Sequence, residues 1–325
     1  MKKNIAVIGC GHWGKNLIRN FAELDVLASV CDPNIELAQT YADLYKVNNC
    51  SFNEILNNIN IKGIVLAVPA PLHASLAIEA MNAGKHVYVE KPLAMNQKEA
   101  EEMISMASKN NVQLMVGHLL QYHPVFIRLL ELVELGVLGN LNYIYSNRLS
   151  FGKVRSEEDV IWSFAPHDIS MILSLTKEEP ESVHTESSAI LQPNIADNAM
   201  IHMSFKSGIM AHISLSWLHP CKEQKLVVTG DSGMAVFDDT KSWEHKLAVY
   251  KHSIKINNQI PNLEKGEVEY VEIEHSEPLK RECQHFVDVV NSNKTPLTNG
   301  NEGLRVLNVL TAATLSANMK ILEQK

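Results

Sequence analysis

Near its N-terminus the chain reads Asn4-Ile5-Ala6-Val7-Ile8-Gly9-Cys10-Gly11-His12-Trp13-Gly14, and this stretch decides the fold. Its apolar start is typical of a strand that is buried on both faces of a parallel sheet. Three glycines follow in a G-x-G-x-x-G pattern, and residues 15–24 have the composition of a helix. A strand, a glycine-rich turn and a helix in this order predict the first unit of a doubly wound α/β domain.

The same alternation continues to about residue 120. Further apolar strands are expected at residues 27–32, 63–69, 86–90 and 113–117, with helices after Pro33 and at about 74–83 and 98–109. Strands that are apolar along their whole length indicate a parallel sheet covered by helices on both faces. We therefore expect residues 1–121 to form one doubly wound domain.

From residue 122 onward the pattern changes. Helices are expected at about 125–135, 159–175, 279–292 and 301–322, and strands at 141–148, 183–191, 197–205, 208–217, 225–229 and 245–254. Consecutive strands joined by short turns predict a mostly antiparallel sheet. Residues 122–325 are therefore expected to form a second domain of the α+β class with a large sheet.

Composition narrows the class of protein. The chain has 325 residues, 46% of them hydrophobic and 20% charged, with a net charge of -8, which argues against nucleic acid or an anionic membrane as the main partner. It contains no signal-peptide pattern and no apolar run long enough to span a bilayer. Five cysteines without metal-type spacing indicate reduced, packed thiols in a cytoplasmic protein without a metal site.

The glycine pattern predicts a dinucleotide site. Gly9 allows the tight turn, Gly11 lets the backbone approach a pyrophosphate, and Gly14 lets the helix lie against the strand. His12 and Trp13 lie inside the pattern and are expected to contact the cofactor. Asp32, at the end of the second strand, is placed to accept hydrogen bonds from ribose hydroxyls and to repel a 2′-phosphate, which favours NAD over NADP. The alternative for Asp32 is a helix cap.

Two further segments end strands at the same predicted edge of the sheet. Val68, Pro69, Pro71 and His73 follow the strand at 63–69 and are expected beside the dinucleotide, although His73 fits a solvent-facing position at a helix start equally well. Glu90-Lys91-Pro92 follows the strand at 86–90. A lysine there points into the cofactor cleft, whereas composition alone favours a surface ion pair for Glu-Lys.

A family resemblance decides between these interpretations. Ala83-Gly84-Lys85-His86-Val87 followed by Glu90-Lys91-Pro92-Leu93-Ala94 resembles the glucose–fructose oxidoreductase, inositol dehydrogenase and rhizopine-catabolism family (Gfo/Idh/MocA). The resemblance covers the whole chain. It implies that Lys91 lines the active site near the reacting hydroxyl and that Glu90 lies near the nicotinamide ribose.

The family's second signature is a helix with an Asp and a His one turn apart. The matching stretch is Trp162-Ser163-Phe164-Ala165-Pro166-His167-Asp168. The resemblance implies that His167 is catalytic and that Trp162 and Ser163 lie at the substrate. Here Ser163 stands where relatives have the carboxylate, which leaves more of the proton transfer to Lys91. Asp168 does not replace it, because adjacent helix residues do not face each other. Pro166 inside the helix weakens this argument.

These groups predict an NAD-dependent dehydrogenase. A secondary alcohol would lie between Lys91, His167 and the nicotinamide, and a neutral amine or imidazole would take the hydroxyl proton as hydride leaves the carbon. The sequence leaves open which of the two groups is the base.

The substrate is suggested by the segment around the domain junction. Gln121 and Tyr122 are expected to cross the cleft, and Arg148, Lys153 and Arg155 precede the His167 helix. Three cations suit a diphosphate, although a solvated charged loop explains them almost equally well. This region resembles the subgroup that oxidises C3 of a UDP-linked N-acetylhexosamine or its uronate for bacterial surface polysaccharide or lipid A.

Other functions remain open. One is a dehydrogenase for a free sugar or cyclitol, or a reductase of a nucleotide-linked keto-sugar. Another, of a different class, is a non-catalytic NAD-binding sensor, against which the intact Lys91 and His167 argue. The resemblance also implies a homodimer or homotetramer that pairs through the outer face of the second sheet, with residues 199–205 on one of its strands.

Overall fold

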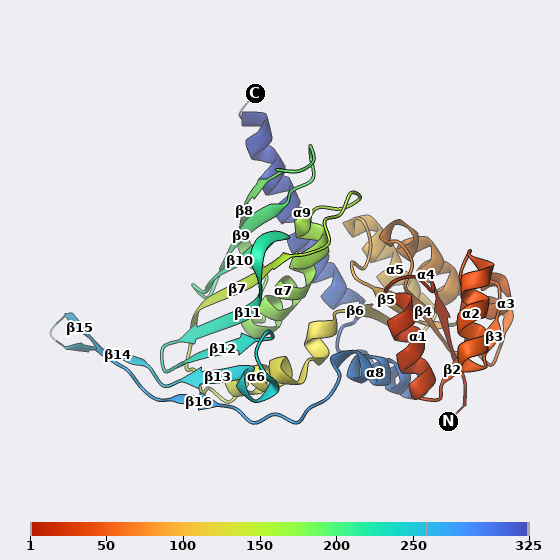
Figure 1. Cartoon of the computed structure of the whole chain (residues 1–325), viewed down its shortest axis with the longest axis horizontal. Helices are drawn as coiled ribbons and strands as arrows, with labels where there is room; N and C mark the ends of the chain where they lie inside the picture. The colour runs from red at the N-terminus through yellow and green to blue at the C-terminus, as the bar shows by residue number, and fades with distance from the viewer. Residues whose placement is uncertain (1, 258, 324–325) are drawn as a thin grey trace. The chain divides into compact units, whose positions relative to one another are not determined.

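The computed structural model describes residues 2–257 and 259–323, which divide into two compact units (Figure 1). The first unit comprises Met1–Tyr122 and Ser276–Leu307, and the second comprises His123–His275 and Asn308–Lys325. The predicted fold class is confirmed: a doubly wound parallel sheet is followed by an α+β unit with a large, mostly antiparallel sheet.

The first unit is built on six parallel strands in the order β3-β2-β1-β4-β5-β6. The strands are β1 (Ile5–Ile8), β2 (Leu27–Cys31), β3 (Asn48–Asn49), β4 (Gly63–Leu66), β5 (His86–Glu90) and β6 (Leu114–Gly117). The helices are α1 (Gly14–Glu23), α2 (Ile35–Tyr45), α3 (Phe52–Asn57), η1 (Ala70–Leu72), α4 (His73–Asn82), α5 (Gln97–Lys109), η2 (Leu119–Tyr122) and α8 (Pro278–Ser292). From β1 the strands are added first on one side of the sheet, up to β3, and then on the other side from β4 onward. Folds of this kind bind ligands at the point between β1 and β4 where this order changes.

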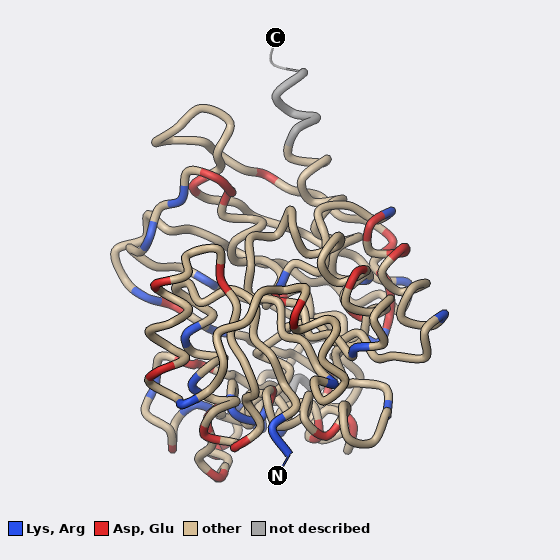
Figure 2. The backbone as a smooth tube through the Cα atoms, turned by 90° about the vertical axis from the view of Figure 1, so that its right-hand side faces the viewer, with Lys and Arg blue, Asp and Glu red and all other residues tan. Residues whose placement is uncertain are grey.

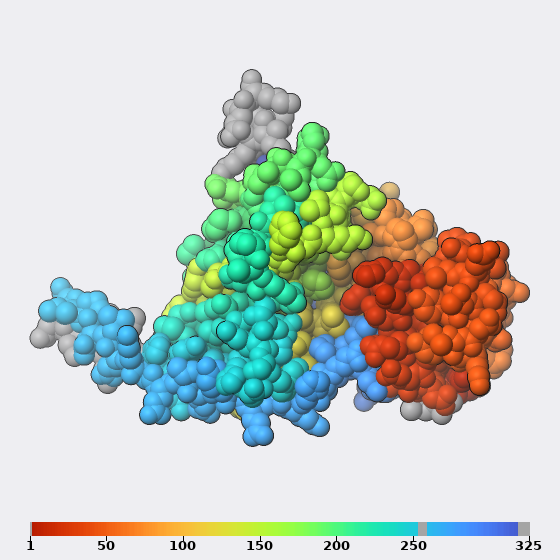
Figure 3. All heavy atoms as spheres, in the orientation of Figure 1, coloured from red at the N-terminus to blue at the C-terminus, as the bar shows by residue number. Residues whose placement is uncertain are grey.

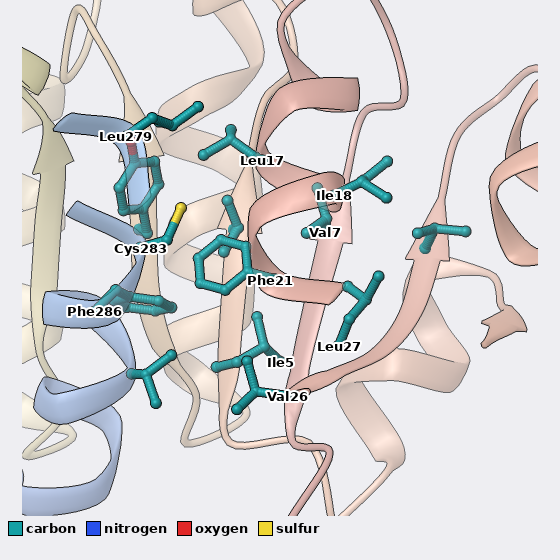
Figure 4. Packing of buried hydrophobic residues seen from close by; sticks show 14 of the residues in the cluster. Ile5, Val7, Leu17, Ile18, Phe21, Val26, Leu27, Leu279, Cys283 and Phe286 are labelled. Atoms are coloured by element: carbon teal, nitrogen blue, oxygen red, sulfur yellow. The ribbon is translucent and has the colours of Figure 1, made fainter. Parts of the chain in front are cut away.

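The first unit differs from the predicted domain boundaries, because it includes helix α8 and the residues around it. Residues 276–307 were expected in the second domain, but they pack on the first unit. The apolar face of α8 covers α1 and β1, as Figure 4 shows. Phe286 meets Phe21 and Tyr88 edge to face, with ring centroids 6.3 and 5.7 Å apart. The amphipathic pattern of α8 predicts that one of its faces is buried, but it does not say against which domain that face packs.

The second unit contains an eight-stranded sheet in the order β16-β13-β12-β11-β7-β10-β9-β8. Its strands are β7 (Leu141–Phe151), β8 (Pro180–Ser188), β9 (Asn198–Phe205), β10 (Met210–Ser216), β11 (Leu218–Gly230), β12 (Met234–Asp238), β13 (Leu247–Tyr250) and β16 (Val268–Tyr270). Its helices are α6 (Pro124–Glu134), α7 (Val160–Thr176) and η3 (Trp243–His245), and α9 (Gly300–Glu323) contributes residues to both units. All neighbouring strands are antiparallel except β7 and β10.

One predicted strand is wrong, because part of it belongs to a separate hairpin. Residues 245–254 were expected to form one strand, but the chain there forms β13 and then β14 (Ser253–Asn257), which pairs with β15 (Ile260–Glu264). Figure 1 shows the hairpin extending away from the rest of the second unit, beyond β13 and β16, and Figure 3 shows the atoms of β15 in the same place. Lys251, which is exposed, and His252, which is half-buried, separate the two strands.

Charged side chains and cysteines are placed as the sequence predicts, except for Cys221. Among the described residues, acidic and basic side chains are interspersed along the backbone (Figure 2). All five cysteines are free, but Cys221 is exposed rather than packed. Within the described part of the chain, no helix is long and apolar enough to cross a membrane, and no group of three or more ligand-type side chains is arranged for a metal ion.

Candidate active site

The candidate site in the first unit lies at the carboxyl edge of its parallel sheet. Gly9 follows β1, Asp32 follows β2, Val68 follows β4, and Lys91 follows β5. Because the strands are parallel, all four positions lie along one edge. The spacing in the sequence therefore brings together the residues that were expected to bind a dinucleotide.

The glycine turn has no room for side chains at two of its positions. Gly9 has a φ of +95°, and a Cβ there would come within 2.7 Å of the Ala67 carbonyl carbon. A Cβ on Gly14 would overlap the carbonyl group of Gly9, with its carbon at 2.8 Å. These contacts show that the first and third glycines allow β1, β4 and α1 to approach one another closely.

Gly11 differs because space is open around it. A Cβ on Gly11 would meet no atom within 4 Å. Helix α1 begins beside it, with no side-chain cap at Trp13 and no acidic residue in its first turn. An uncapped helix N-terminus next to open space suits an anionic group such as a pyrophosphate. The residues at this turn therefore fit NAD, and Gly11 with the start of α1 would hold its diphosphate.

Asp32 belongs to the same turn and is not the cap of the next helix. Its Oδ2 accepts a hydrogen bond from the Cys10 backbone N–H at 2.7 Å, and its Oδ1 accepts one from the Asn34 N–H at 2.9 Å. The cap of α2 is Asn34, whose side chain accepts from the Leu37 N–H at 3.1 Å. Asp32 thus fixes the glycine turn while its charge remains at the end of β2.

This placement predicts the effect of Asp32→Asn on cofactor choice. The amide keeps the size of the side chain but removes the negative charge that repels a 2′-phosphate, so we expect the preference for NAD over NADP to fall at least about tenfold. Fluorescence titrations with NADH and NADPH measure the two affinities. An unchanged ratio would show that Asp32 does not select the cofactor, and the exposed Asp43 provides a control position for the same substitution.

Glu90 links the glycine turn to the end of β5. Its Oε1 accepts hydrogen bonds from Trp13 Nε1 at 2.5 Å and from the Tyr88 hydroxyl at 3.1 Å. Burial raises the pKa of Glu90, although Trp13, Lys91 and Tyr88 each lower it. Gly117 permits this arrangement, because a Cβ there would lie 2.7 Å from the Tyr88 hydroxyl. A carboxyl group held by an indole and a phenol is therefore fixed in direction.

Lys91 and His118 lie close enough to influence each other. His118 follows β6 and is buried, and burial, followed by the charge of Lys91, lowers its pKa to about 4. The imidazole is therefore neutral at physiological pH. The same lysine charge also lowers the pKa of buried His73, after the larger effect of burial. Lys91 thus lies near two buried imidazoles, those of His73 and His118.

Glu282 is a buried acid near Glu90 and Tyr88. It lies on α8, one turn before Phe286, and its side chain is 1% exposed. Among the described residues, neither of its oxygens has a well-formed hydrogen bond. Burial raises the pKa of Glu282, the charge of Glu90 raises it further, and Tyr88 opposes this in part. Because an unpaired buried carboxylate is costly, burial beside Glu90 favours the protonated form of Glu282.

The raised pKa predicts how Glu282→Gln changes stability with pH. A proton bound more tightly in the folded chain stabilises it below the unfolded pKa, and this stabilisation is lost as pH rises through the folded pKa. Glutamine cannot ionise. We therefore expect the Tm of the variant to match that of the wild type near pH 5 and to exceed it increasingly toward about pH 8. Thermal denaturation checks this, with the exposed Glu102→Gln as control; a difference independent of pH contradicts it.

In the second unit, α7 carries His167 and the residues around it. The helix is capped by Asp159, whose side chain accepts from the Trp162 N–H at 3.0 Å, and it packs against β7, β9 and β10. His167 is half-buried and Ser163, one turn earlier, is buried, so the two lie on the same side of the helix. Pro166 is accommodated inside α7. His167 and Lys91 belong to different units.

Asp168 holds Arg148, which had been expected to bind substrate. Arg148 Nε lies 2.6 Å from Asp168 Oδ2, and its Nη2 lies 3.2 Å from Oδ1. Ser146 Oγ donates to the same carboxylate at 2.6 Å, and Asp168 is 1% exposed. This contact uses the forked edge of the guanidinium that would recognise a phosphate. Arg148 thereby anchors α7 on β7, and its contact with substrate stays a prediction.

Five other predicted residues take specific positions. His73 is buried, so the alternative of a solvent-facing helix start is wrong. Tyr122 is also buried, and its hydroxyl contacts Thr298 Oγ1 at 2.9 Å inside the first unit. Trp162 Nε1 donates to Thr314 Oγ1 at 3.0 Å, and Arg155 contacts Glu158 at 3.0 Å. Gln121 is buried beside Tyr122 in η2.

Sequence reasoning missed Tyr88, His118 and Glu282. His118 follows the last parallel strand, so the rule that ligands bind at strand ends supplied a signal for it. Tyr88 lies inside an apolar run and reads as a core residue. Glu282 gives no signal, because its contact with Glu90 depends on the return of α8 to the first unit.

The first unit's sheet order, glycine turn and acidic residue after β2 define a dinucleotide-binding unit of the Rossmann type. The chain belongs to the Gfo/Idh/MocA oxidoreductase family: residues 3–118 match its NAD-binding Rossmann fold, and residues 126–236 match its C-terminal domain. Binding of NAD is a property of this family, in agreement with the geometry of the turn.

Individual relatives act on sugars and cyclitols. The chain is 27% identical over 303 residues to UDP-N-acetylglucosamine 3-dehydrogenase of Acidithiobacillus ferrooxidans, which covers 93% of both chains. A solved structure of that enzyme superimposes with a TM-score of 0.86 over 97% of each chain, at 25% identity. Inositol 2-dehydrogenase of Salmonella typhimurium is 23% identical over 273 residues, or 79% of this chain and 80% of that protein.

Proposed function

We propose that the protein oxidises the C3 hydroxyl of a UDP-linked N-acetylhexosamine or its uronate to the 3-keto sugar, with NAD as hydride acceptor. Its place would be in the formation of sugars for the bacterial surface polysaccharide or lipid A. The observation that carries this proposal is the end-to-end similarity to the UDP-N-acetylglucosamine 3-dehydrogenase. The family supplies the coarser part, an NAD-binding oxidoreductase.

The chemistry assigned to the chain's own residues is proton transfer and orientation. Bound NAD supplies a two-electron acceptor for hydride. Lys91 takes the proton of the substrate hydroxyl as a neutral amine, and the buried imidazoles of His73 and His118 lie close enough for its charge to lower their pKa values. Glu90 orients the neighbouring Trp13 at the cofactor turn. His167 shares the proton transfer from α7, with Ser163 in place of an orienting carboxylate.

The substrate's diphosphate requires cations. Lys153 is exposed and Arg155 is half-buried in the loop between β7 and α7, and we assign the diphosphate to these two side chains. Arg155 contacts Glu158 on one side and keeps further donors for a ligand. Gln121, Trp162 and Ser163 are assigned to the sugar.

A second candidate function is oxidation of a cyclitol. The similarity to inositol 2-dehydrogenase favours it, since that relative also covers most of the chain. A cyclitol carries no diphosphate, so the cationic loop between β7 and α7 would then have no ligand. This difference in charge separates the two candidates.

Direct assay distinguishes them. Purified protein with NAD is incubated with UDP-N-acetylglucosamine, its uronate, myo-inositol or glucose, and NADH absorbance is followed. We expect turnover with a UDP-sugar only, and loss of at least about tenfold in kcat/KM for Arg155→Ala with little change in NADH affinity. Turnover with myo-inositol alone would replace the first proposal by the second, and no turnover with any of them would contradict both.

Self-association belongs to the same proposal. We propose a homodimer or homotetramer formed through the outer face of the eight-stranded sheet, where Met200 and Met210 are exposed. Sedimentation of the purified protein tests this, and a monomer at micromolar concentration would contradict it.

A further inference from the structure

His73 joins two loops at the carboxyl edge of the first unit's sheet. It begins α4 and is 1% exposed. Its Nδ1 lies 2.8 Å from the Pro92 carbonyl oxygen, and its Nε2 lies 3.0 Å from the Val68 carbonyl oxygen. One carbonyl belongs to the segment after β5 and the other to the segment after β4. Both ring nitrogens are therefore engaged by the protein itself.

In both contacts of His73 the ring nitrogen must be the hydrogen-bond donor. A carbonyl oxygen only accepts hydrogen bonds, so each contact requires an N–H on the ring. A neutral imidazole carries one N–H and an imidazolium carries two. The imidazolium therefore satisfies both contacts and the neutral ring satisfies one of them, and in both states the two ring nitrogens face carbonyl oxygens of the protein. The polar contacts of His73 are thus made to the protein, whereas the sequence predicts a contact with the cofactor.

The Pro92 contact fixes the backbone immediately after Lys91. Pro92 has no backbone N–H, so its carbonyl is the group through which its position is held by hydrogen bonding. The Glu90 side chain holds the other side, accepting from the Lys91 N–H at 3.3 Å. The lysine is thus anchored on both sides, by a carboxyl group before it and an imidazole after it.

We propose that His73 is a positioning residue that ties the Lys91–Pro92 segment to the Val68 loop and thereby directs the Lys91 amine, without touching cofactor or substrate itself. The inference uses the role of Lys91 given under the proposed function. It adds a residue from α4 whose two contacts act on different parts of the site. One contact orients the lysine, and the other holds the loop beside the dinucleotide.

Two conservative variants separate these contacts. Asparagine places its amide nitrogen near the position of Nδ1 and keeps a donor for Pro92, whereas glutamine places it near Nε2 and keeps a donor for Val68. His73→Ala removes both. If the contacts act as proposed, each amide variant rescues a different property of the site, which a purely structural histidine would not do.

The test measures both properties on the NAD-bound protein without substrate. Competitive labelling with acetic anhydride and peptide mass spectrometry gives the reactivity of Lys91, with Lys98, whose side chain is 86% exposed, as internal reference. NADH fluorescence gives cofactor affinity. In His73→Ala we expect the Lys91 rate to shift about fivefold toward that of Lys98 and NADH affinity to fall about fivefold. His73→Asn should restore the lysine rate, and His73→Gln should restore the affinity.

Two results would overturn the proposal. In one, His73→Ala folds and leaves both the Lys91 rate and the NADH affinity unchanged. In the other, the asparagine and glutamine variants are alike in both readouts, which indicates a general packing role. If the alanine variant does not fold, the two amide variants still decide. Because no sugar is present, failure of UDP-sugar turnover leaves these readouts intact and contradicts the proposed function alone.

Discussion

Lys91→Met is expected to lower turnover by about three orders of magnitude. Methionine keeps an unbranched stem of similar length but removes the amine that takes the hydroxyl proton. The loss should appear in kcat, because the group acts in the chemical step rather than in binding. NADH affinity should change by less than about tenfold, since the glycine turn and Asp32 hold the cofactor.

The measurement is steady-state NADH formation with the substrate that the wild-type protein oxidises, together with a fluorescence titration of NADH. Lys98→Met is the matched control, because that side chain is 86% exposed and should leave both values unchanged. The pH profile adds a second check: the ascending limb that reports the base should disappear in Lys91→Met. Turnover within about tenfold of wild type would shift the role of base to His167.

Gly14→Ala is expected to have the largest effect on folding. Its Cβ would overlap the Gly9 carbonyl, whose carbon lies at 2.8 Å, so both the turn and α1 must move. Both sides of the contact are backbone, which cannot rotate away. We expect a loss of about 3 kcal/mol of unfolding free energy and no detectable NADH binding. Denaturant unfolding and NADH fluorescence measure the two effects.

Gly11→Ala is the matched comparison within the same turn. A Cβ there meets nothing within 4 Å, and neither Gly11 nor Gly14 requires a positive φ, so the two substitutions differ only in available space. Gly11→Ala should therefore unfold like the wild type but bind NADH at least about tenfold more weakly, because the methyl group intrudes where the diphosphate lies. Equal stability losses in both variants would contradict this account of the turn.

Local sequence patterns predict much of the nucleotide-binding unit. The apolar run before Gly9 and the acidic residue after the next strand predict both the sheet and the cofactor turn, because each feature depends on neighbours close along the chain. The carboxyl-edge position of Lys91 follows from the same pattern. These predictions needed only strand direction, which parallel connections fix.

The remaining features depend on contacts between distant segments. Helix α8 returns to the first unit through Phe286, and this brings Glu282 to Tyr88 and Glu90. Arg148 and Asp168 are 20 residues apart, and only the packing of α7 on β7 brings them together. His73 reads as a helix start, and its burial becomes visible only when the loops after β4 and β5 are placed. Such contacts leave no periodic signal.

In the proposed reaction, hydride leaves C3 of a UDP-linked N-acetylhexosamine. The most direct test uses UDP-N-acetylglucosamine labelled with deuterium at C3, with NAD and the purified protein, and mass spectrometry of the reduced cofactor. We predict one deuterium on the NADH formed, a slower rate than with unlabelled substrate, and a 3-keto sugar as the product. NADH without deuterium, or no NADH from this substrate while myo-inositol is oxidised, would contradict the account.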